Sequence, residues 1–306
     1  DRFRNVDNMK YSVIIVTYNR CELLKEAVEC ALNQSVKPSQ IVIINNASDD
    51  GTYEYLKKLN KDYKGGTCLV IKTLKKNTGG AGGFYYGLKA AHRLGDDWHV
   101  IIDDDAMLEH DFMYRISGAI KIYKDVSCFA GKVITDGRII TDHRRNMVYP
   151  GFRFKTIPEY IYKKNRVFSC DTASFCGVVI KDSLIEIIGY PKKKYFIWYD
   201  DTEYCVRIRK YSRILVITNA VINHKTALPL MEWPRHYTWK DYYGMRNRID
   251  MVRSHGSLLD RLYNRAYMWI NVRLRNTLFD IINFHGDDWK YELETYKRAV
   301  KDSRHM

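Results

Sequence analysis

The sequence predicts an α/β protein with a mostly parallel central sheet and a helical extension at its C-terminus. Three observations support this prediction. Short apolar runs rich in Val and Ile alternate with segments of helical periodicity through the first hundred residues. Those runs are apolar almost without interruption, which is typical of strands buried on both faces of a parallel sheet. From residue 235 onward the chain is helical in pattern, basic and aromatic.

Four apolar runs in the first half are the expected parallel strands. They cover residues 11–16, 41–44, 68–73 and 98–102. The expected helices lie between them, at 21–33, 52–60 and, after a Gly-rich loop at 77–83, at 84–94. Beyond residue 125 the pattern loosens and predicts short strands at 126–134, 137–141, 166–169, 174–181 and 214–222, with a helix at 200–210.

Composition bounds the classes of protein that this chain can be. The 306 residues are 46% hydrophobic and 28% charged, which is typical of a globular protein with its own core. We expect a leader or linker at 1–9, an α/β domain at 10–234 and a helical region at 235–306. No run of about 18 uncharged apolar residues is present, so no membrane-spanning helix is expected. Seven cysteines without a Cys-x-x-Cys pair favour a reducing, cytoplasmic environment.

The chain is strongly basic, with 50 Lys and Arg against 36 Asp and Glu and a net charge of +14. Such a surface attracts anionic partners such as nucleic acid, anionic lipid or phosphorylated small molecules. No helix-turn-helix, zinc-finger or RNP pattern accompanies the charge, so we expect no nucleic-acid partner.

Polar clusters follow three of the expected strands. They are Thr17-Tyr18-Asn19, Asn45 to Asp49, and Asp103-Asp104-Asp105. Ligands of such sheets bind outside the carboxyl ends of the strands. Three adjacent carboxylates repel one another unless a cation neutralises them, and hard oxygen ligands favour Mg²⁺ or Mn²⁺, which bridge phosphates. A solvated acidic turn is the alternative interpretation.

A Gly-rich stretch from Asn77 to Phe84 opens the third expected helix. Its glycines let the backbone approach a ligand closely, and a helix N-terminus favours a phosphate or a sugar hydroxyl. The glycines are Gly79, Gly80, Gly82 and Gly83. The stretch matches neither a Walker A loop nor G-x-G-x-x-G. A flexible turn is the alternative.

A second acidic cluster, Asp200-Asp201-Thr202-Glu203, follows the aromatic run 195–199. Carboxylates beside large aromatic rings are partly desolvated, which is how a carboxylate becomes a useful base. The rings also suit the apolar face of a sugar. Acidic residues favoured by a helix N-terminus are the alternative. His224 ends a strand and, together with the aspartates, is a candidate third metal ligand.

Taken together and in order, these clusters resemble family 2 glycosyltransferases of the GT-A fold, a Rossmann-like architecture. The resemblance covers about residues 10–225, and it rests on Val16 to Arg20, Asn46 to Thr52, Asp103 to Asp105, Phe175 to Gly177, Asp200 to Glu203 with Arg207, and His224. The stretch from Asn77 to Phe84 is similar to that of bacterial galactofuranosyltransferases, and 242–247 looks like the same group.

The resemblance implies an inverting, metal-dependent transfer of a sugar from a nucleotide-sugar donor in polysaccharide biosynthesis. It implies Asp201 as the general base, with Asp103, Asp105 and His224 as ligands of Mn²⁺ or Mg²⁺. The implied donor-binding residues are Thr17, Tyr18, Asn19, Asn45, Asn46, Asn77, Gly79, Gly80, Gly82, Gly83, Asp103 and Asp104. We expect the acceptor, a cell-surface glycan or a lipid-linked sugar, to contact Trp198, Tyr199, Asp200 and Glu203.

The sequence leaves the donor open. The resemblance favours galactofuranose from UDP-galactofuranose, while rhamnose from dTDP-rhamnose or another hexose is the alternative. The family usually has Asp where this chain has Asn45, whose amide oxygen can still accept a hydrogen bond from the base but lacks the charge, and the choice between uracil and thymine therefore stays open. A nucleotidyltransferase would carry a basic Gly-rich loop near the first strand, which is absent here. A non-catalytic sugar- or nucleotide-binding protein would not need Asp201 beside a metal site.

The segment 257–284 mixes large apolar residues with arginines. That composition is typical of a helix lying on anionic lipid, which would place the protein at the inner face of the cell membrane. The alternative is a helix that packs over the α/β domain with solvated arginines, and polar residues such as Asp260 and Asn264 favour it. Self-association through this region is a third option, and the oligomeric state stays open.

Overall fold

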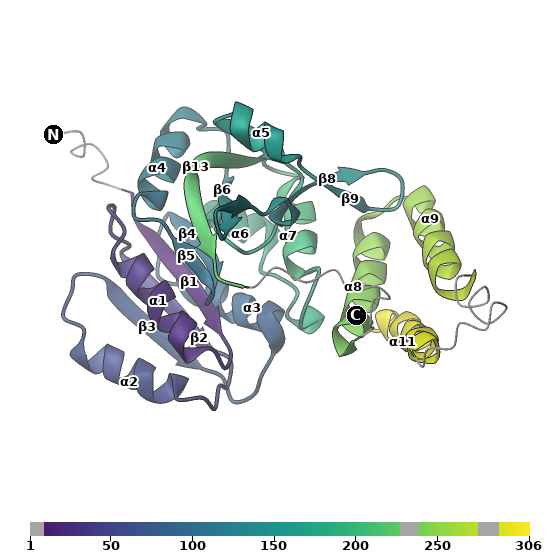
Figure 1. The fold of residues 1–306 in the computed structure, drawn as a ribbon, viewed down its shortest axis with the longest axis horizontal. Coiled ribbons are helices and arrows are strands. Elements are labelled where there is room, and N and C mark those ends of the chain that lie inside the picture. The colour runs from purple at the N-terminus through teal and green to yellow at the C-terminus, as the bar shows by residue number, and fades with distance from the viewer. Residues whose placement is uncertain (1–8, 227–237, 275–287) are drawn as a thin grey trace.

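The computed structural model describes residues 9–226, 238–274 and 288–306. Apart from Met9, the expected leader lies outside the described residues. A ten-stranded sheet forms the centre of the molecule (Figure 1), with the order β10-β13-β6-β12-β4-β1-β2-β3 and with β5 and β7 on its margins. Its strands are β1 (Tyr11–Thr17), β2 (Gln40–Asn45), β3 (Cys68–Thr73), β4 (Trp98–Asp103), β5 (Ala106–Leu108), β6 (Cys128–Thr135), β7 (Arg138–Ile139), β10 (Val167–Cys170), β12 (Val178–Lys181) and β13 (Ile214–His224).

Strands β3, β2, β1 and β4 are mutually parallel, which confirms the expected α/β class. The register pairs Thr17 of β1 with Asn45 of β2, and Val16 of β1 with Asp103 of β4. The polar residues that end these strands therefore meet at one edge of the sheet. The other half is mixed, because β12 runs antiparallel to both β4 and β6.

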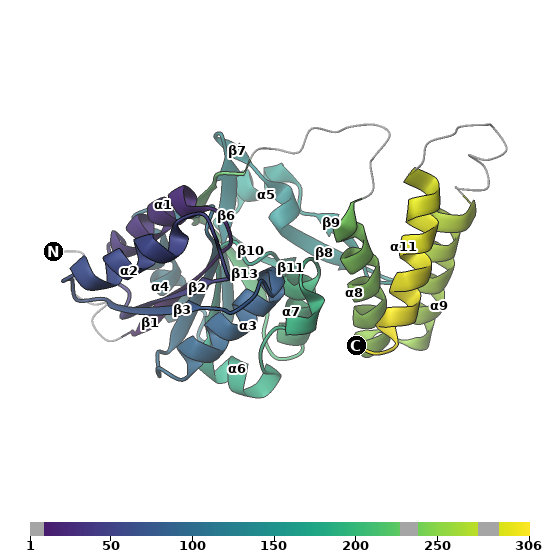
Figure 2. The same cartoon turned by 90° about the horizontal axis from the view of Figure 1, so that it is seen from below.

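Helices cover both faces of the sheet (Figure 2). Alternate residues of β1 belong to different cores: Val13 and Ile15 pack on one face, while Ile14 and Val16 pack on the other. The helices up to residue 208 are α1 (Cys21–Leu32), α2 (Thr52–Asp62), α3 (Gly79–His92), α4 (Phe112–Ile122), α5 (Glu159–Lys164), α6 (Asp182–Ile188) and α7 (Asp200–Ile208). Helices α1, α2 and α4 supply the first core, and α3, α6 and α7 supply the second.

Helix α3 lies unusually close to β1. A Cβ atom added to Gly83 would lie 2.3 Å from Val16 Cγ1, and one added to Gly87 would lie 2.5 Å from Ile14 Cγ2. Helix α3 begins at Gly79, five residues before the expected start, so most of the expected Gly-rich loop is the first turns of this helix. The glycines therefore allow close packing of helix on strand.

A small second sheet leads toward the C-terminal helices. Its strands are β8 (Arg144–Val148), β9 (Arg153–Thr156) and β11 (Thr172–Ala173). The β8–β9 hairpin reaches the helices that follow β13, as Figure 1 shows. These helices are α8 (Trp239–His255), α9 (Leu258–Trp269), the π-helical turn η3 (Ile270–Leu274) and α11 (Asp288–Ser303). They confirm the expected helical extension.

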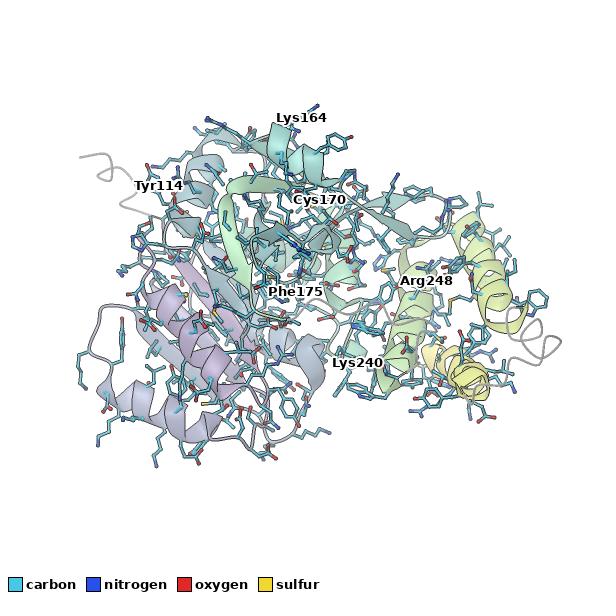
Figure 3. The ribbon with its side chains drawn as sticks, viewed as in Figure 1. Tyr114, Lys164, Cys170, Phe175, Lys240 and Arg248 are labelled. Atoms are coloured by element: carbon cyan, nitrogen blue, oxygen red, sulfur yellow. The ribbon has the colours of Figure 1, made fainter. Side chains whose placement is uncertain are left out.

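Helix α9 packs with a polar stripe facing inward. Asp260, Asn264 and Met268, each four residues apart, are buried. Asp260 Oδ1 accepts a hydrogen bond of 2.7 Å from Gly151 N at the hairpin tip. Arg248, labelled in Figure 3, donates from α8 to Asn264 Oδ1 at 2.8 Å. No described helix is both long and apolar enough to cross a bilayer.

The pattern-based predictions missed several elements. Helices α4 and α6 and the β8–β9 hairpin had no predicted counterpart. Of the strand expected at 174–181, only 178–181 form a strand, β12, and β11 lies just before the expected range. Strands β8 and β9 are short, and their sequences RRNMV and RFKT show neither the alternation of a half-buried strand nor the apolar run of a fully buried one.

The close packing of α3 on β1 gives a stability prediction. Replacing a helical glycine by alanine normally stabilises a protein by ~0.5–1 kcal/mol. Gly87→Ala should instead lower the free energy of unfolding by ~1–3 kcal/mol, because its Cβ must displace Ile14. Gly118→Ala, at an exposed position of α4 where an added Cβ has no atom within 4 Å, is the matched control and should stabilise. Urea unfolding of both variants measures the difference, and equal effects would contradict the packing.

Candidate active site

Three aspartates at the end of β4 form the centre of the candidate site. Arg20, just after β1, donates from Nη1 to Asp105 Oδ2 at 2.7 Å and to Asp104 Oδ1 at 3.2 Å. The backbone N–H of Tyr18 points to Asp104 Oδ2 at 3.4 Å. The strand ends that the sequence singled out are thus brought together, as expected from a parallel sheet.

The aspartates differ in charge because their surroundings differ. Burial, reinforced by the charges of Asp105 and Asp104, raises the pKa of Asp103 well above its ordinary value. Burial also raises the pKa of Asp104 to about 6, against the opposing effects of the neighbouring Thr17 side chain and the charge of Arg20. Asp105 is buried too, but the nearby His224 imidazole, a hydrogen bond from Thr226 and the charge of Arg20 outweigh burial and hold its pKa below the ordinary value.

Asp105 and His224 suit a divalent cation. Asp105 Oδ1 is buried, has no hydrogen-bond partner within the described ranges and faces His224 Nε2 at 3.3 Å. An unpartnered carboxylate oxygen beside an imidazole nitrogen offers two ligand atoms that Mn²⁺ or Mg²⁺ accepts. Ligand atoms that all lie within 4.8 Å of one another occur elsewhere, at His92, Asp182 and Glu186. The ligand atoms of the predicted set, Asp103, Asp105 and His224, lie farther apart than this.

The turn after β2 is tied to the start of α3. Asn46 Nδ2 donates to Asn77 Oδ1 and to the carbonyl of Gly79, both at 3.0 Å, and Asn46 Oδ1 accepts from Thr78 N at 2.9 Å. Asn45 is fully buried, and its Oδ1 accepts from Ser48 N at 2.9 Å. Both asparagines therefore shape the loops around the predicted nucleotide site.

Two further predicted residues lie at this edge of the sheet. Asn19, with a φ of 52°, donates from its backbone to Ser48 Oγ at 3.0 Å and accepts from Asp49 N at 2.9 Å. The Tyr18 side chain is 43% exposed and can face a ligand.

The predicted glycines divide into two groups. Gly79, with a φ of 69°, and Gly80 form the first turn of α3, where backbone N–H groups are free of helical partners. Gly82 and Gly83 are buried, and Gly83 contacts β1 as described above. Their positions indicate packing, so the ligand contact expected of Gly82 and Gly83 is not what the structure favours.

The aromatic turn 195–199 joins η2 (Lys193–Tyr195) to α7 and is strained. Phe196, Trp198 and Tyr199 all have φ between 63° and 66°. Such conformations cost ~1–3 kcal/mol each and are rare for bulky residues. Ile197 N donates to the Tyr195 carbonyl at 2.8 Å, which closes a γ-turn of the strained, positive-φ form at Phe196.

The turn delivers Asp200 and Asp201 to the first turn of α7. Burial and the charge of Asp201 raise the pKa of Asp200 to about 8, and Asp200 in turn helps to raise the pKa of Asp103. The two acidic clusters therefore share one electrostatic environment. Asp201 Oδ1 accepts from the Thr202 hydroxyl at 2.9 Å and from the Thr202 backbone N–H.

Glu203 lies elsewhere than expected for an acceptor-binding residue. It is fully buried, its Oε1 lies 2.8 Å from His255 Nε2, and its Oε2 is 2.9 Å from Arg207 Nη2. Burial alone would raise the pKa of Glu203, but the His255 hydrogen bond and the charges of Arg207 and Lys192 outweigh it and lower that pKa. This placement favours a structural role.

Pattern analysis did not include several site residues. Arg20 was quoted only as part of a motif, although a cation directly after the first strand could have been matched to the aspartates. Thr226, whose hydroxyl donates to Asp105 Oδ2, carried no recognisable signal. Asn247 of α8, which the sequence singled out only as part of the stretch 242–247, lies at the aromatic turn, where its Nδ2 contacts three carbonyls.

Comparisons with known proteins agree with this geometry. Residues 12–186, more than half of the chain, match Glycosyl transferase family 2. The chain is 22% identical over 195 residues to Galactofuranosyltransferase GlfT1 of Mycolicibacterium smegmatis, which covers 62% of each protein. It thus spans less than two thirds of that relative. It is 21% identical over 281 residues to dTDP-rhamnosyl transferase RfbF of Shigella flexneri, covering 87% of this chain and 88% of RfbF.

The fold matches solved structures. TarS 1-349 of S. aureus, in a crystal structure in complex with UDP-GlcNAc, superposes with a TM-score of 0.58 at 16% identity. The superposition covers 96% of this chain and 80% of that one. At this identity the likeness is one of fold.

Proposed function

The chain belongs to glycosyl transferase family 2 and has the GT-A fold, and we propose that it transfers galactofuranose from UDP-galactofuranose with inversion. The proposed acceptor is a glycan or lipid-linked sugar in polysaccharide biosynthesis. One observation supports the assignment of the site: two acidic clusters, Asp103 to Asp105 at the end of β4 and Asp200 with Asp201 at the start of α7, share one electrostatic environment beside the first turn of α3.

In this proposal the strand-end residues bind the donor. Thr17, Tyr18 and Asn19 face the nucleoside, with Asn45 and Asn46 shaping the loops around it. Asp103, Asp105 and His224 would hold Mn²⁺ or Mg²⁺, supported by the unpartnered Oδ1 of Asp105. Such an ion, when bound, neutralises charge on the departing diphosphate.

Asp201 is proposed to be the base. Its carboxylate takes the proton from the acceptor hydroxyl, and that oxygen bonds to the anomeric carbon while the bond from this carbon to the diphosphate oxygen breaks. A single displacement inverts the anomeric centre and needs one base. The half-buried carboxylate at the N-terminus of α7, beside exposed Trp198, is open to an acceptor, which supports the assignment.

Galactofuranose is supported by the stretch from Asn77 to Phe84 and by the name of the relative GlfT1. Rhamnose is the second candidate, supported by the greater coverage of RfbF. Both donors present a sugar diphosphate to the same edge of the sheet, so the fold does not separate them and donor turnover does.

Donor turnover tests the proposed reaction. UDP-galactofuranose should release nucleoside diphosphate with Mn²⁺ and not with EDTA, because charge on the leaving group then stays unneutralised. UDP-galactopyranose, UDP-glucose and dTDP-rhamnose form the comparison panel. Asp105→Ala should lose the Mn²⁺-dependent part of UDP affinity, measured by calorimetry. Turnover of dTDP-rhamnose alone would make rhamnose the donor sugar in place of galactofuranose. Undiminished turnover in EDTA would contradict the proposed dependence on a metal ion.

The base assignment has its own test. Asp201→Asn should lower kcat for transfer by ~10²–10⁴-fold, the usual contribution of a positioned base. UDP affinity should stay within about twofold, since Asp201 is not among the proposed nucleotide contacts. Glu186→Gln, which neutralises an exposed carboxylate on α6, is the control and should keep full activity. Full activity of Asp201→Asn would require another base.

Helix α9 presents its apolar side to solvent. The exposed residues repeat at helical spacing along one face: Leu258, Leu259, Leu262, Ala266, Trp269 and Ile270. Leu258 is 72% exposed and Trp269 is 50% exposed. Arg261 and Arg265 are exposed on one flank of this face, and the inward side is the polar stripe of Asp260 and Asn264.

We further propose that this apolar face rests on an anionic membrane surface at the cytoplasmic side. In such a contact the exposed apolar stripe enters the boundary between headgroups and acyl chains, and the flanking arginines interact with the anionic headgroups. The net charge of +14 adds a long-range attraction to such a surface. This contact would bring the enzyme to a lipid-linked acceptor.

Vesicle co-sedimentation tests the membrane contact. The full chain should pellet with phosphatidylglycerol vesicles and not with phosphatidylcholine vesicles. Leu262→Glu with Trp269→Glu should abolish pelleting, because two carboxylates then enter the apolar face. The control, Tyr53→Glu with Leu94→Glu, adds the same charge at exposed apolar residues elsewhere and should still pellet. If the unmodified chain does not bind vesicles but self-associates, and Leu262→Glu with Trp269→Glu abolishes that self-association, the face contacts a second copy of the chain instead.

A further inference from the structure

Asn247 of α8 holds the strained aromatic turn through one amide group. Its Nδ2 lies 2.9 Å from the carbonyl oxygen of Tyr195, 3.0 Å from that of Ile197 and 2.8 Å from that of Trp198. The side chain is fully buried. One neutral amide NH₂ group thus donates to three carbonyl oxygens. These oxygens converge on it because the turn has positive φ angles.

Arg246, the preceding residue of α8, adds hydrogen bonds both to the Asn247 side chain and to the turn. Its guanidinium donates to Asn247 Oδ1 from Nη2 at 2.9 Å and from Nε at 3.1 Å, which orients the amide with its NH₂ toward the turn. The same Nη2 donates to the carbonyls of Lys194 at 2.6 Å and Tyr195 at 3.2 Å. The Asn247 amide orientation is therefore determined by its neighbour.

The turn that Asn247 holds also contacts the start of α3. The carbonyl oxygen of Phe196 accepts from Ala81 N at 3.1 Å. A Cβ atom at Gly79 would lie 1.9 Å from the same oxygen, so the two segments fit only with glycine at this position. On α8, a Cβ atom at Gly244 would lie 2.8 Å from the Trp198 ring. The turn is thus clamped between α3 and α8.

From these contacts we propose that Asn247 is a positioning residue for transfer. By holding the carbonyls of the turn, it sets Trp198 for the acceptor and Asp201 for the proton, relative to the first turn of α3. Asn247 touches neither substrate in this proposal, and its effect on turnover rests on the proposed function. The family match ends at residue 186, so both the turn and its holder lie beyond it.

A readout without activity tests the contact itself. Lys193 and Lys194 are exposed and precede the turn, and Arg246 holds the Lys194 carbonyl. Limited trypsin digestion, with the first cut identified by mass spectrometry, should cleave after these lysines several-fold faster in Asn247→Leu and Asn247→Asp than in the unmodified chain. Leucine removes the donor, and aspartate directs a carboxylate at three carbonyls.

A core variant separates positioning from lost stability. Ile116→Ala leaves a cavity in the core on the opposite face of the sheet and should reduce stability without faster cleavage at the turn. If the lysines are cut no faster in the Asn247 variants than in Ile116→Ala, the proposal is overturned. Circular dichroism confirms that each variant is folded before digestion.

The kinetic arm measures the consequence for transfer. Asn247→Asp should lower kcat by ~10²-fold or more, since a misplaced base loses most of its contribution, with UDP affinity within about twofold of the unmodified chain. Ile116→Ala should keep kcat below its melting temperature. An unchanged kcat in Asn247→Asp overturns positioning. An unmodified chain that turns over no donor contradicts the proposed function instead, and the proteolysis comparison still decides the contact.

Discussion

Concentrated negative charge at the end of β4 is the constraint around which this site is organised. A parallel sheet brings its strand ends to one edge, so Asp103, Asp104 and Asp105 lie together in a poorly hydrated place. Carboxylates in that position keep a charge only beside positive groups. Arg20, directly after the neighbouring strand β1, provides one through its contacts with Asp104 and Asp105, and the neighbours of each aspartate therefore decide which of the three stays ionised.

A second acidic cluster depends on the first through the aromatic turn. Asp200 is buried close enough to Asp103 for its charge to disfavour ionisation of Asp103. Bringing them together requires a backbone that three non-glycine residues adopt only under strain. The free energy of that strain is offset by hydrogen bonds from α8, a helix outside the family match. The C-terminal helices are in this sense part of the site.

The sequence predicted the parallel half of the fold because its strands are buried on both faces and read as unbroken apolar runs. It also predicted which strand ends meet, since topology alone places them at one edge. It could not predict that Glu203 is fully buried, because an acidic residue in the first turn of a helix gives the same pattern whether it faces solvent or the side chains of Arg207, Lys192 and His255. Nor could it separate Gly79 from Gly83, whose different neighbours come from β1 and from the turn.

The contact between α8 and the aromatic turn joins residues about fifty positions apart in the chain. Consider the exchange of segments between relatives of this protein, whether by recombination or by design. A crossover placed between residues 209 and 238 would combine the turn of one parent with the helix of another. Three converging carbonyls would then meet whatever side chain the second parent supplies. The turn and α8 therefore have to be inherited together, so a crossover that preserves this contact lies either before residue 192 or after residue 256.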